Sequence, residues 1–401
     1  MATFQEWGWK EVVWSTVAAY LAYWIAVYVY RVTFHPLAKF PGPKLAAMTF
    51  TFWYEFYYEV YPNQLQYLWK IKELHEQYGP IIRINPRHIH INDPDFFDNI
   101  YASSPHKRDR CTWYMHTGSK NLSGGMLETI DHDLHKMRRN AVSSFFSKRS
   151  IQALEPMVYD TTRRLIKRLK EDGAKGKVIP LNAAWAALAM DTISTYCFGE
   201  GVGSIEREQY GQEWVDIIHN GIRIRPFARQ FPTLINMLLD LPPSLAAKLN
   251  PDIAMMNNFN NDLLTKIEKV MAGADDYENK SGVAGHRTVF HEIRDGNMPE
   301  AEKAPKRLMS EGSVFLAAGT ETTGRTLSVI TYYVFEKPSI RTQLMAELRT
   351  VLPTEDTRAT LPQLEALPYL TAVINEGLRT AHGVSSRQPH TPTQDDLHYK
   401  Q

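Results

Sequence analysis

The hydrophobic pattern of this chain has two parts. A run of nineteen residues without charge, from Val12 to Tyr30, lies near the amino terminus. As a helix this run would be about 28 Å long, close to the thickness of a bilayer's hydrocarbon core. Beyond it, apolar residues recur at helical spacing through most of the chain. The pattern predicts one membrane-spanning helix followed by a mainly helical domain.

The residues around the apolar run predict how it lies in a membrane. Aromatic side chains stand at both ends, as they do at membrane interfaces. Arg31 and two lysines follow the run, whereas Lys10 and Glu11 cancel before it, which places the bulk of the protein in the cytosol. A cleaved signal peptide is the alternative, but no small-residue cleavage site follows the run. We expect residues 1–31 to be a single-pass anchor in the endoplasmic reticulum membrane.

A proline-rich linker, residues 32–45, is expected between the anchor and a domain of residues 46–401. Its prolines lack the backbone donors that a continued helix needs. Within the domain, Ile81 to Ile91 reads IIRINPRHIHI, which alternates apolar and polar positions on either side of Pro86. This alternation predicts two short strands joined by a turn.

Most of the remaining chain has the spacing of amphipathic helices. The expected helices are Leu65 to Tyr78, Asp131 to Phe146, Ile151 to Glu171, Ala183 to Cys197, Glu206 to Ile222, Met256 to Ala272, Lys306 to Phe335, Ser339 to Val351 and Leu361 to Arg379. The polar stretch from Ala272 to Asn297 is expected to be a surface loop. The predicted fold class is therefore mainly α with a small β-sheet.

Charge and cysteine content exclude some classes of function. Lys and Arg number 45 against 44 for Asp and Glu, so the net charge of +1 gives no basic field for nucleic acid. The two cysteines, Cys111 and Cys197, are too few for a disulfide framework and lack the clustered spacing of a zinc site. A reducing, cytosol-facing compartment fits this composition.

The apolar segment that begins near Lys306 contains an unusual sequence, FLAAGTETT, from Phe315 to Thr323. An interior glycine costs a helix about 1 kcal/mol relative to alanine, and threonine is a mediocre helix former. The sequence weakens the helix where it passes the core, which indicates that something flat or small approaches there. Close helix packing, with the threonine hydroxyls bonded to the preceding turn, is the alternative.

The motif Ala318-Gly319-x-Glu321-Thr322-Thr323 resembles the oxygen-binding motif in the central helix of cytochrome P450 enzymes. The resemblance implies that Ala318 and Gly319 make room for dioxygen over haem b. It implies catalytic roles for Thr322, whose hydroxyl would hydrogen-bond the oxygen, and for Glu321, an acid that would relay protons. The redox chemistry itself would belong to the haem.

A second motif, His135-x-x-Arg138-Arg139 followed by SFFS, resembles the helix whose basic residues bind a haem propionate. His135 and Arg139 are four apart and share a helix face, and arginine suits bidentate binding of a carboxylate. The resemblance implies that both residues bind the cofactor. A solvated basic helix face is the alternative.

A third motif, NEGLR, places Glu376 and Arg379 three residues apart on one helix face. In isolation this spacing usually means an exposed ion pair of little energetic weight. It lies some fifty residues after the AGTETT motif and resembles the E-x-x-R motif of the same family, in which the pair is buried and structural. The resemblance implies that Glu376 and Arg379 are a structural pair.

The chain departs from the family pattern at the ligand of the haem iron. The family carries a thiolate in an F-x-x-G-x-R-x-C-x-G loop that lies roughly sixty to eighty residues beyond the E-x-x-R helix. Only twenty-two residues follow Arg379, and Cys111 and Cys197 lie far upstream. His390 also stands where fungal relatives carry an arginine that contacts a propionate. The haem cysteine is therefore expected beyond the end of the chain, which supplies no metal ligand of its own.

The resemblance implies an oxidoreductase of fungal secondary metabolism. It would be a haem monooxygenase that receives electrons from an NADPH-cytochrome P450 reductase and oxidises an apolar substrate of the terpenoid or polyketide class. The absent cysteine predicts that this truncated chain is inactive. The alternative function is therefore a membrane-anchored remnant of the family that performs no catalysis.

Overall fold

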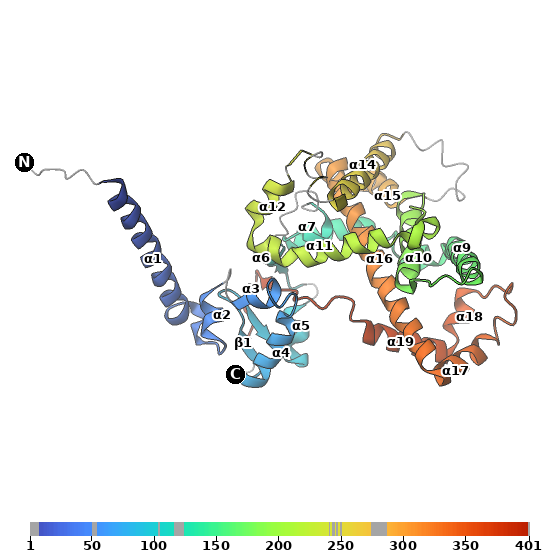
Figure 1. Cartoon of the computed structure of the whole chain (residues 1–401), viewed down its shortest axis with the longest axis horizontal. Coiled ribbons are helices and arrows are strands. Elements are labelled where there is room, and N and C mark those ends of the chain that lie inside the picture. Colours follow the sequence, from blue (N-terminus) through green and yellow to red (C-terminus); the bar gives the residue numbers. More distant parts are fainter. Residues whose placement is uncertain are drawn as a thin grey trace, which may run out of the picture. The chain divides into compact units, whose positions relative to one another are not determined.

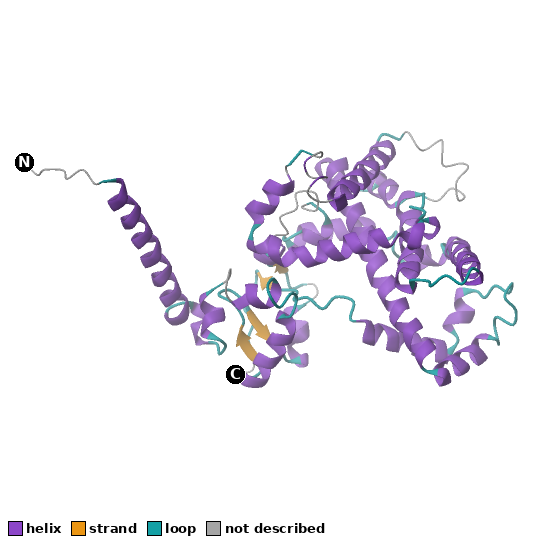
Figure 2. Cartoon of the chain, viewed as in Figure 1, coloured by secondary structure: helices purple, strands orange, loops and turns teal. Residues whose placement is uncertain are grey.

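A computed structural model describes residues 8–49, 54–102, 105–115, 124–239, 241–242, 245, 248, 251–273 and 287–399. These residues are mainly helical and form only short strands (Figure 2), which confirms the expected fold class. Contacts divide the chain into two compact units. The first comprises Met1–Tyr114, Arg223–Pro232 and Ser386–Gln401, and the second comprises Met115–Ile222 and Thr233–Ser385.

The first unit combines short helices with two small antiparallel sheets. Its helices are α1 (Trp9–Thr33), α2 (Lys44–Met48), α3 (Tyr54–Glu59), α4 (Tyr67–Tyr78), α5 (Phe97–Ile100) and, at its boundary, α6 (Thr112–Met115). Strand β1 (Ile81–Arg83) pairs with β2 (Ile89–Ile91), with Ile82 opposite His90, so the predicted pair of strands is confirmed. Strand β3 (Arg108–Arg110) pairs with β4 (His390–Pro392).

Helix α1 alone, among the described residues, is long and apolar enough to cross a membrane. Its most apolar window has a mean hydropathy of 1.6, and none of that window is buried by the protein. Apolar side chains that no protein surface covers are stable in a lipid phase. The structure therefore contains the helix that the sequence predicts as an anchor.

The proline-rich linker lies against the first sheet. The Arg83 backbone N–H donates to the Pro41 carbonyl at 2.7 Å. Gly42 follows with a φ of +147°, and a Cβ there would lie 2.4 Å from the Arg83 carbonyl oxygen. Glycine suits this position because no side chain fits between the two backbones. Behind the strand, α4 covers Ile82 with an apolar face that includes Tyr67.

The second unit is almost entirely helical. It contains α7 (His132–Ser143), α8 (Lys148–Gln152), α9 (Glu155–Ala174), α10 (Leu181–Phe198), α11 (Gln212–Gln230, whose last turns belong to the first unit), α12 (Pro232–Leu239), α14 (Pro251–Met271), α15 (Val289–Asp295), α16 (Pro305–Glu336), α17 (Pro338–Leu348), α18 (Leu361–Glu365) and α19 (Pro368–Ala381). Figure 1 shows α16, the long orange helix, running beside α10 and reaching α17 and α19 at its carboxyl end.

Small residues let α10 and α16 approach closely. A Cβ on Gly324 would lie 2.9 Å from the Ala186 Cα, and one on Gly319 would lie 3.0 Å from the Ile193 side chain. The contact at Gly324 leaves no room for a side chain, because it is with the backbone of α10, whereas a side chain at Gly319 would require Ile193 to move by a few tenths of an ångström. Close helix packing, which the alternative interpretation of the AGTETT motif expects, is therefore observed at Gly319.

Several expected elements differ from the structure. The helix expected over Ile151 to Glu171 is divided into α8 and α9, and the helix expected from Glu206 begins at Gln212 as α11. The helix expected over Leu361 to Arg379 is interrupted, because α18 ends at Glu365 and Pro368 starts α19. Proline lacks the N–H that a continuous helix would use there and fits the first turn of a new one. The loop expected from Ala272 to Asn297 contains α15, which buries Val289, Phe290 and Ile293. Because α15 is only seven residues long and lies in a polar stretch, its apolar spacing does not stand out in the sequence.

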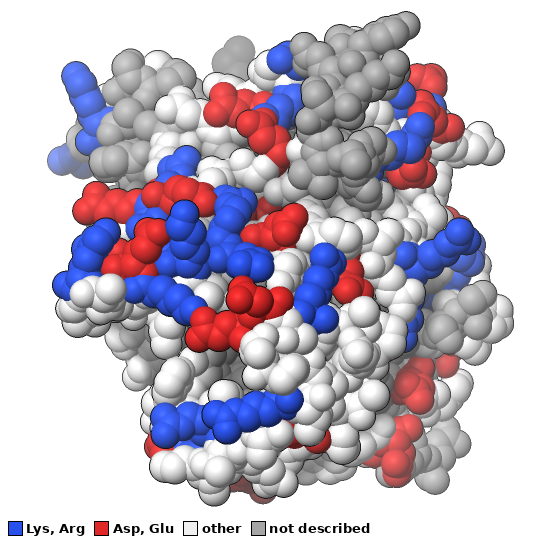
Figure 3. Space-filling view, turned by 90° about the vertical axis from the view of Figure 1, so that its right-hand side faces the viewer, with Lys and Arg blue, Asp and Glu red and all other residues white. Residues whose placement is uncertain are grey.

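Charged side chains of both signs interleave on the face of the molecule shown in Figure 3. Lysine and arginine do not gather there into a field of one sign, in agreement with the net charge of +1. Such a face offers little long-range attraction to a polyanion.

Candidate functional site

The AGTETT motif occupies the middle of α16, so its residues point in different directions around one rigid helix. Gly319 faces Ile193 on α10. Thr320 is buried beside Met190 of the same helix, with its hydroxyl 3.3 Å from the sulfur. Ala318 lies on the exposed side. Only part of the motif therefore faces away from the α10 interface.

Thr322 lies one turn beyond Ala318 on the exposed side of α16. Its hydroxyl donates to the Ala318 carbonyl at 2.9 Å. The alternative interpretation of the motif also expected the threonine hydroxyls to bond to the preceding turn of the helix. A hydroxyl that donates to the backbone keeps its oxygen lone pairs for another donor. The geometry thus leaves Thr322 able to accept a hydrogen bond from a ligand.

Glu321 has a partner that sequence reasoning missed. Its Oε1 lies 3.0 Å from the Nε2 of His219 on α11, 102 positions away in the chain. Both side chains line a cavity of about 400 Å³ together with Arg325 and Tyr332 of α16. No local pattern marks His219, because contacts between distant segments leave no periodic signal. The contact holds the carboxylate at the wall of an open cavity, where an acid can exchange protons with water.

The two adjacent arginines of α7 have different surroundings. Arg138 forms a bidentate pair with Glu302, at 2.7 and 3.0 Å, and also donates to the Thr129 hydroxyl at 2.7 Å. Arg139 is exposed, and no ion pair is found for it among the described residues. His135 is half-buried on the same helix face as Arg139. The structure therefore leaves Arg139, and not Arg138, available to an anionic ligand.

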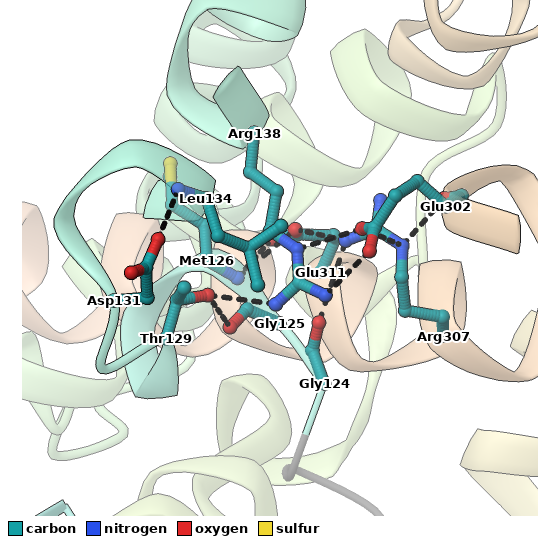
Figure 4. A network of polar contacts seen from close by, with 10 residues as sticks. All are labelled: Gly124, Gly125, Met126, Thr129, Asp131, Leu134, Arg138, Glu302, Arg307 and Glu311. Atoms are coloured by element: carbon teal, nitrogen blue, oxygen red, sulfur yellow. Dashed lines mark hydrogen bonds and ion pairs between the residues drawn. The ribbon is translucent and has the colours of Figure 1, made fainter. Parts of the chain in front are cut away.

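A buried polar network continues from Arg138 to the first turns of α16 (Figure 4). Both carboxylate oxygens of Glu311 accept from the Met126 N–H, at 2.9 and 3.0 Å, and Arg307 donates to Glu311 at 2.7 Å. Only 3% of the Glu311 side chain is exposed. The Arg138 guanidinium holds the pKa of Glu302 below its usual value. This network joins the loop before α7 to the amino end of α16.

The predicted pair on α19 forms, but it is not buried. Arg379 donates to Glu376 at 2.6 and 2.5 Å, while 70% of the arginine side chain and 61% of the glutamate side chain are exposed. Gly377 instead faces α16, where a Cβ would lie 2.2 Å from the Ile330 side chain. Because the buried stripe of α19 runs through Gly377 and Ala381, the charged residues lie outside it. The burial expected from the resemblance is therefore not found.

The residues around the expected haem fit that cofactor only in part. Cys197 is fully buried in α10, and burial raises the pKa of its thiol far above the usual value, which disfavours the thiolate that iron requires. Cys111 already contacts His88, at 3.1 Å. His390 contacts the Gln388 carbonyl at 2.9 Å, and burial lowers its pKa. Arg139 is exposed on α7, but neither cysteine is placed as a free iron ligand.

The described residues contain no group of three or more His, Cys, Asp or Glu that could hold a metal ion. A protein-bound metal centre of that kind therefore has no support in the described part of the chain. The candidate site consists of the exposed side of the α16 motif, the Glu321–His219 contact and the basic face of α7.

Comparison with known proteins identifies what the chain is similar to. The family model for cytochrome P450 matches residues 50–398. Cytochrome P450 monooxygenase ucsK of Acremonium sp is 39% identical over 398 residues, which cover 96% of this chain and 74% of that protein. Cytochrome P450 monooxygenase tpcC of Cochliobolus heterostrophus is 37% identical, with 93% and 70% covered. Tryptophan 6-hydroxylase fscE of Fusarium equiseti is 36% identical, with 89% and 68% covered.

Proposed function

Since the chain belongs to the cytochrome P450 family, we propose that it is a membrane-bound monooxygenase of fungal secondary metabolism. The observation that carries this proposal is the match to monooxygenases along nearly the whole chain. The motif on α16 and the exposed Arg139 on α7 add local support, because they offer an acid, a hydroxyl and an anion-binding group on two helices of one unit.

The roles of the site residues follow from their positions. Glu321 would hold and pass a proton at its carboxylate, which His219 orients and the cavity keeps in contact with water. Thr322 would accept one hydrogen bond at the exposed side of α16, because its own hydrogen is donated to Ala318. Arg139, with His135 beside it, would bind a propionate of haem b, the cofactor that supplies the redox chemistry of this family. Neither Cys111 nor Cys197 fits the role of the iron ligand.

The substrate and location are also proposals. An apolar substrate of the terpenoid or polyketide class is supported by α1, because a protein held at a membrane meets molecules that partition into it. The positive residues after α1 favour a single pass in the endoplasmic reticulum with the bulk in the cytosol, where an NADPH-cytochrome P450 reductase would deliver electrons. Deletion of residues 1–33 should move the protein from the membrane pellet to the supernatant or to aggregates.

A second candidate function is a membrane-anchored protein of the same architecture that performs no catalysis. It is favoured by one observation, the surroundings of Cys111 and Cys197 described above. The Cys111 thiol already contacts His88, and the Cys197 thiol lies in the core, so neither thiol is presented to a metal. This second function needs no haem.

The reduced carbon-monoxide spectrum of the purified chain, expressed with haem supplied, distinguishes the two functions. Thiolate ligation gives a strongly red-shifted band, which the monooxygenase requires. Arg139→Ala should lower the ratio of haem to protein, and Lys136→Ala, an exposed residue of the same helix, is the matched control. Haem bound without the red-shifted band, or no haem at all, would show that residues 1–401 alone do not hold haem through a thiolate, and would favour the second function for these residues.

A further inference from the structure

A cavity in the second unit has opposite charges on one wall. It has a volume of about 400 Å³ and is lined by residues of α10, α11, α16 and α19. Glu321 and Arg325 belong to this lining and lie about one turn apart on α16. Small-molecule sites are of this size, and a few placed polar groups within them fix the chemistry of the ligand. These two charges therefore indicate which ligand the cavity suits.

Glu321 and Arg325 do not form the ion pair that their spacing favours. Residues four apart on a helix are neighbours, and opposite charges at this spacing attract each other. The Arg325 Nε instead donates to the Ala381 carbonyl of α19 at 2.7 Å. The Oε1 of Glu321 lies 3.0 Å from the Nε2 of His219 on α11. Contacts with two other helices thus keep opposite charges apart on one wall of the cavity.

Each of the two charged groups keeps an unused hydrogen-bonding position. Within the described part of the chain, no acceptor is found for the Nη1 and Nη2 groups of Arg325, and no donor for the Oε2 of Glu321. An arginine fork with free N–H groups suits a carboxylate, and a carboxylate oxygen with free lone pairs accepts from an ammonium group. The wall is therefore complementary to a molecule that carries both charges.

The neighbouring part of the lining suits an aromatic group. Tyr332 and Tyr333 both line the cavity, and 60% of the first residue and 40% of the second are exposed. Their rings lie 5.2 Å apart between centroids in a T-shaped arrangement. Val215 and Val329 add apolar surface to the same lining. Accessible aromatic rings pack favourably against the face or edge of another ring.

We propose that this cavity binds an α-amino acid with an aromatic side chain, its carboxylate on Arg325 and its ammonium on Glu321. Both charges of an α-amino acid are attached to one carbon, so a single molecule can reach two side chains that are neighbours on a helix. The inference goes beyond the proposed function, because binding requires neither haem nor electrons. A bound ammonium group would also occupy the carboxylate to which we assign a proton, and would keep it from exchanging that proton with water.

The test is isothermal titration calorimetry of the whole chain in detergent, without added haem, with three probes. L-Phenylalanine carries both charges, 3-phenylpropionate lacks the ammonium group and phenethylamine lacks the carboxylate. L-Phenylalanine should bind about tenfold or more tightly than either analogue, because each analogue loses one charge-assisted contact. Equal affinity for the three probes, or no saturable binding of L-phenylalanine up to about 10 mM, would overturn the proposal.

Substitutions of the two charged residues assign the contacts. Arg325→Gln should weaken L-phenylalanine by about tenfold and leave phenethylamine within about twofold, and Glu321→Gln should weaken L-phenylalanine equally while sparing 3-phenylpropionate. Arg341→Gln, at an exposed arginine of α17 outside the cavity lining, is the matched control and should bind all three probes as the wild type does.

Circular dichroism shows whether each variant is folded, and the three probes on the wild type decide the matter where a variant is not. Wild-type affinity for L-phenylalanine in folded Arg325→Gln or Glu321→Gln, or an equal loss in Arg341→Gln, would contradict the proposal. A missing red-shifted band in the carbon-monoxide spectrum bears on the monooxygenase alone, because the titration is made without haem.

Discussion

Two ion pairs on helices of the second unit have nearly the same spacing in sequence and opposite surroundings in the structure. Arg307 and Glu311 are four residues apart at the amino end of α16, and about a tenth or less of either side chain is exposed. Glu376 and Arg379 are three residues apart on α19, and most of each side chain is exposed. Spacing predicts both contacts equally well. The spacing does not show whether a pair is buried, and burial decides how much each pair contributes to the stability of the fold.

The first pair also has partners outside its helix. Glu311 accepts the Met126 N–H, and Arg307 lies 3.4 Å from Glu302, which is bound by Arg138. The α19 pair has no such partners among the described residues. A buried charge that loses its partner keeps its full desolvation cost, whereas an exposed charge is solvated by water. Substitutions in each pair test whether burial accounts for the difference in stability between them.

The largest effect is expected for Glu311→Ala. It leaves the buried Arg307 guanidinium with only the more distant Glu302 carboxylate, at 3.4 Å, and the Met126 N–H without an acceptor, and should cost about 3–5 kcal/mol of unfolding free energy. Urea denaturation followed by circular dichroism measures this. Glu311→Gln keeps one acceptor and should lose less. A loss for Glu311→Ala no larger than that for Glu376→Ala would show that burial does not separate the two pairs.

Arg138→Ala should have the next largest effect. It removes three hydrogen bonds and leaves the Glu302 carboxylate with Arg307 alone, at a cost of about 2–3 kcal/mol. Arg139→Ala, the neighbouring residue on the same helix, is the control and should leave the melting temperature of the haem-free chain unchanged, because its side chain is exposed. Equal losses of stability in the two variants would show that Arg138 does not contribute more to the fold than Arg139 does.

A smaller effect is expected from acid. The pKa of Glu302 is lower in the folded chain than the ordinary glutamate value, so the folded state binds fewer protons and its stability falls as the pH drops below about 4.5. Glu302→Gln cannot titrate, so its unfolding free energy should fall less than that of the wild type between about pH 5 and about pH 3. Identical pH dependence in both proteins would remove Glu302 from the acid response.

The smallest effect is expected at the exposed pair. Glu376→Ala should leave the melting temperature within the error of scanning calorimetry, because both charges of the pair are solvated and screened. The pKa of Glu376 is lowered by Arg379, but solvent weakens the consequence for stability. A loss comparable to that of Arg138→Ala would restore the structural role that the sequence motif implies for this pair.

Long periodic segments were predictable from sequence, and contacts between distant segments were not. The helix expected from Lys306 to Phe335 is observed as Pro305–Glu336, because thirty residues of apolar spacing leave little ambiguity. The strands around Pro86 were also predictable from strict alternation. In contrast, α15 is too short for its periodicity to stand out from a polar stretch.

The candidate site was predictable as a set of residue types but not as a geometry. The motif placed Glu321 on α16, but His219, its partner at 3.0 Å, comes from α11 and carries no motif. The sequence also could not show that Gly319 packs against Ile193, since that contact depends on how α10 lies against α16. Neither contact could be predicted for the same reason, because helix packing brings together side chains that are far apart in the sequence.

Hydrogen–deuterium exchange over α16 is the most direct test of the claim that its buried network, and not the exposed pair, holds the functional helix in place. The account predicts faster exchange in Glu311→Ala over residues 124–129 and along α16 toward Phe315, where local opening becomes easier. Glu376→Ala should exchange at the wild-type rate over the same residues. Equal acceleration of α16 in both variants, or none in Glu311→Ala, would contradict the account.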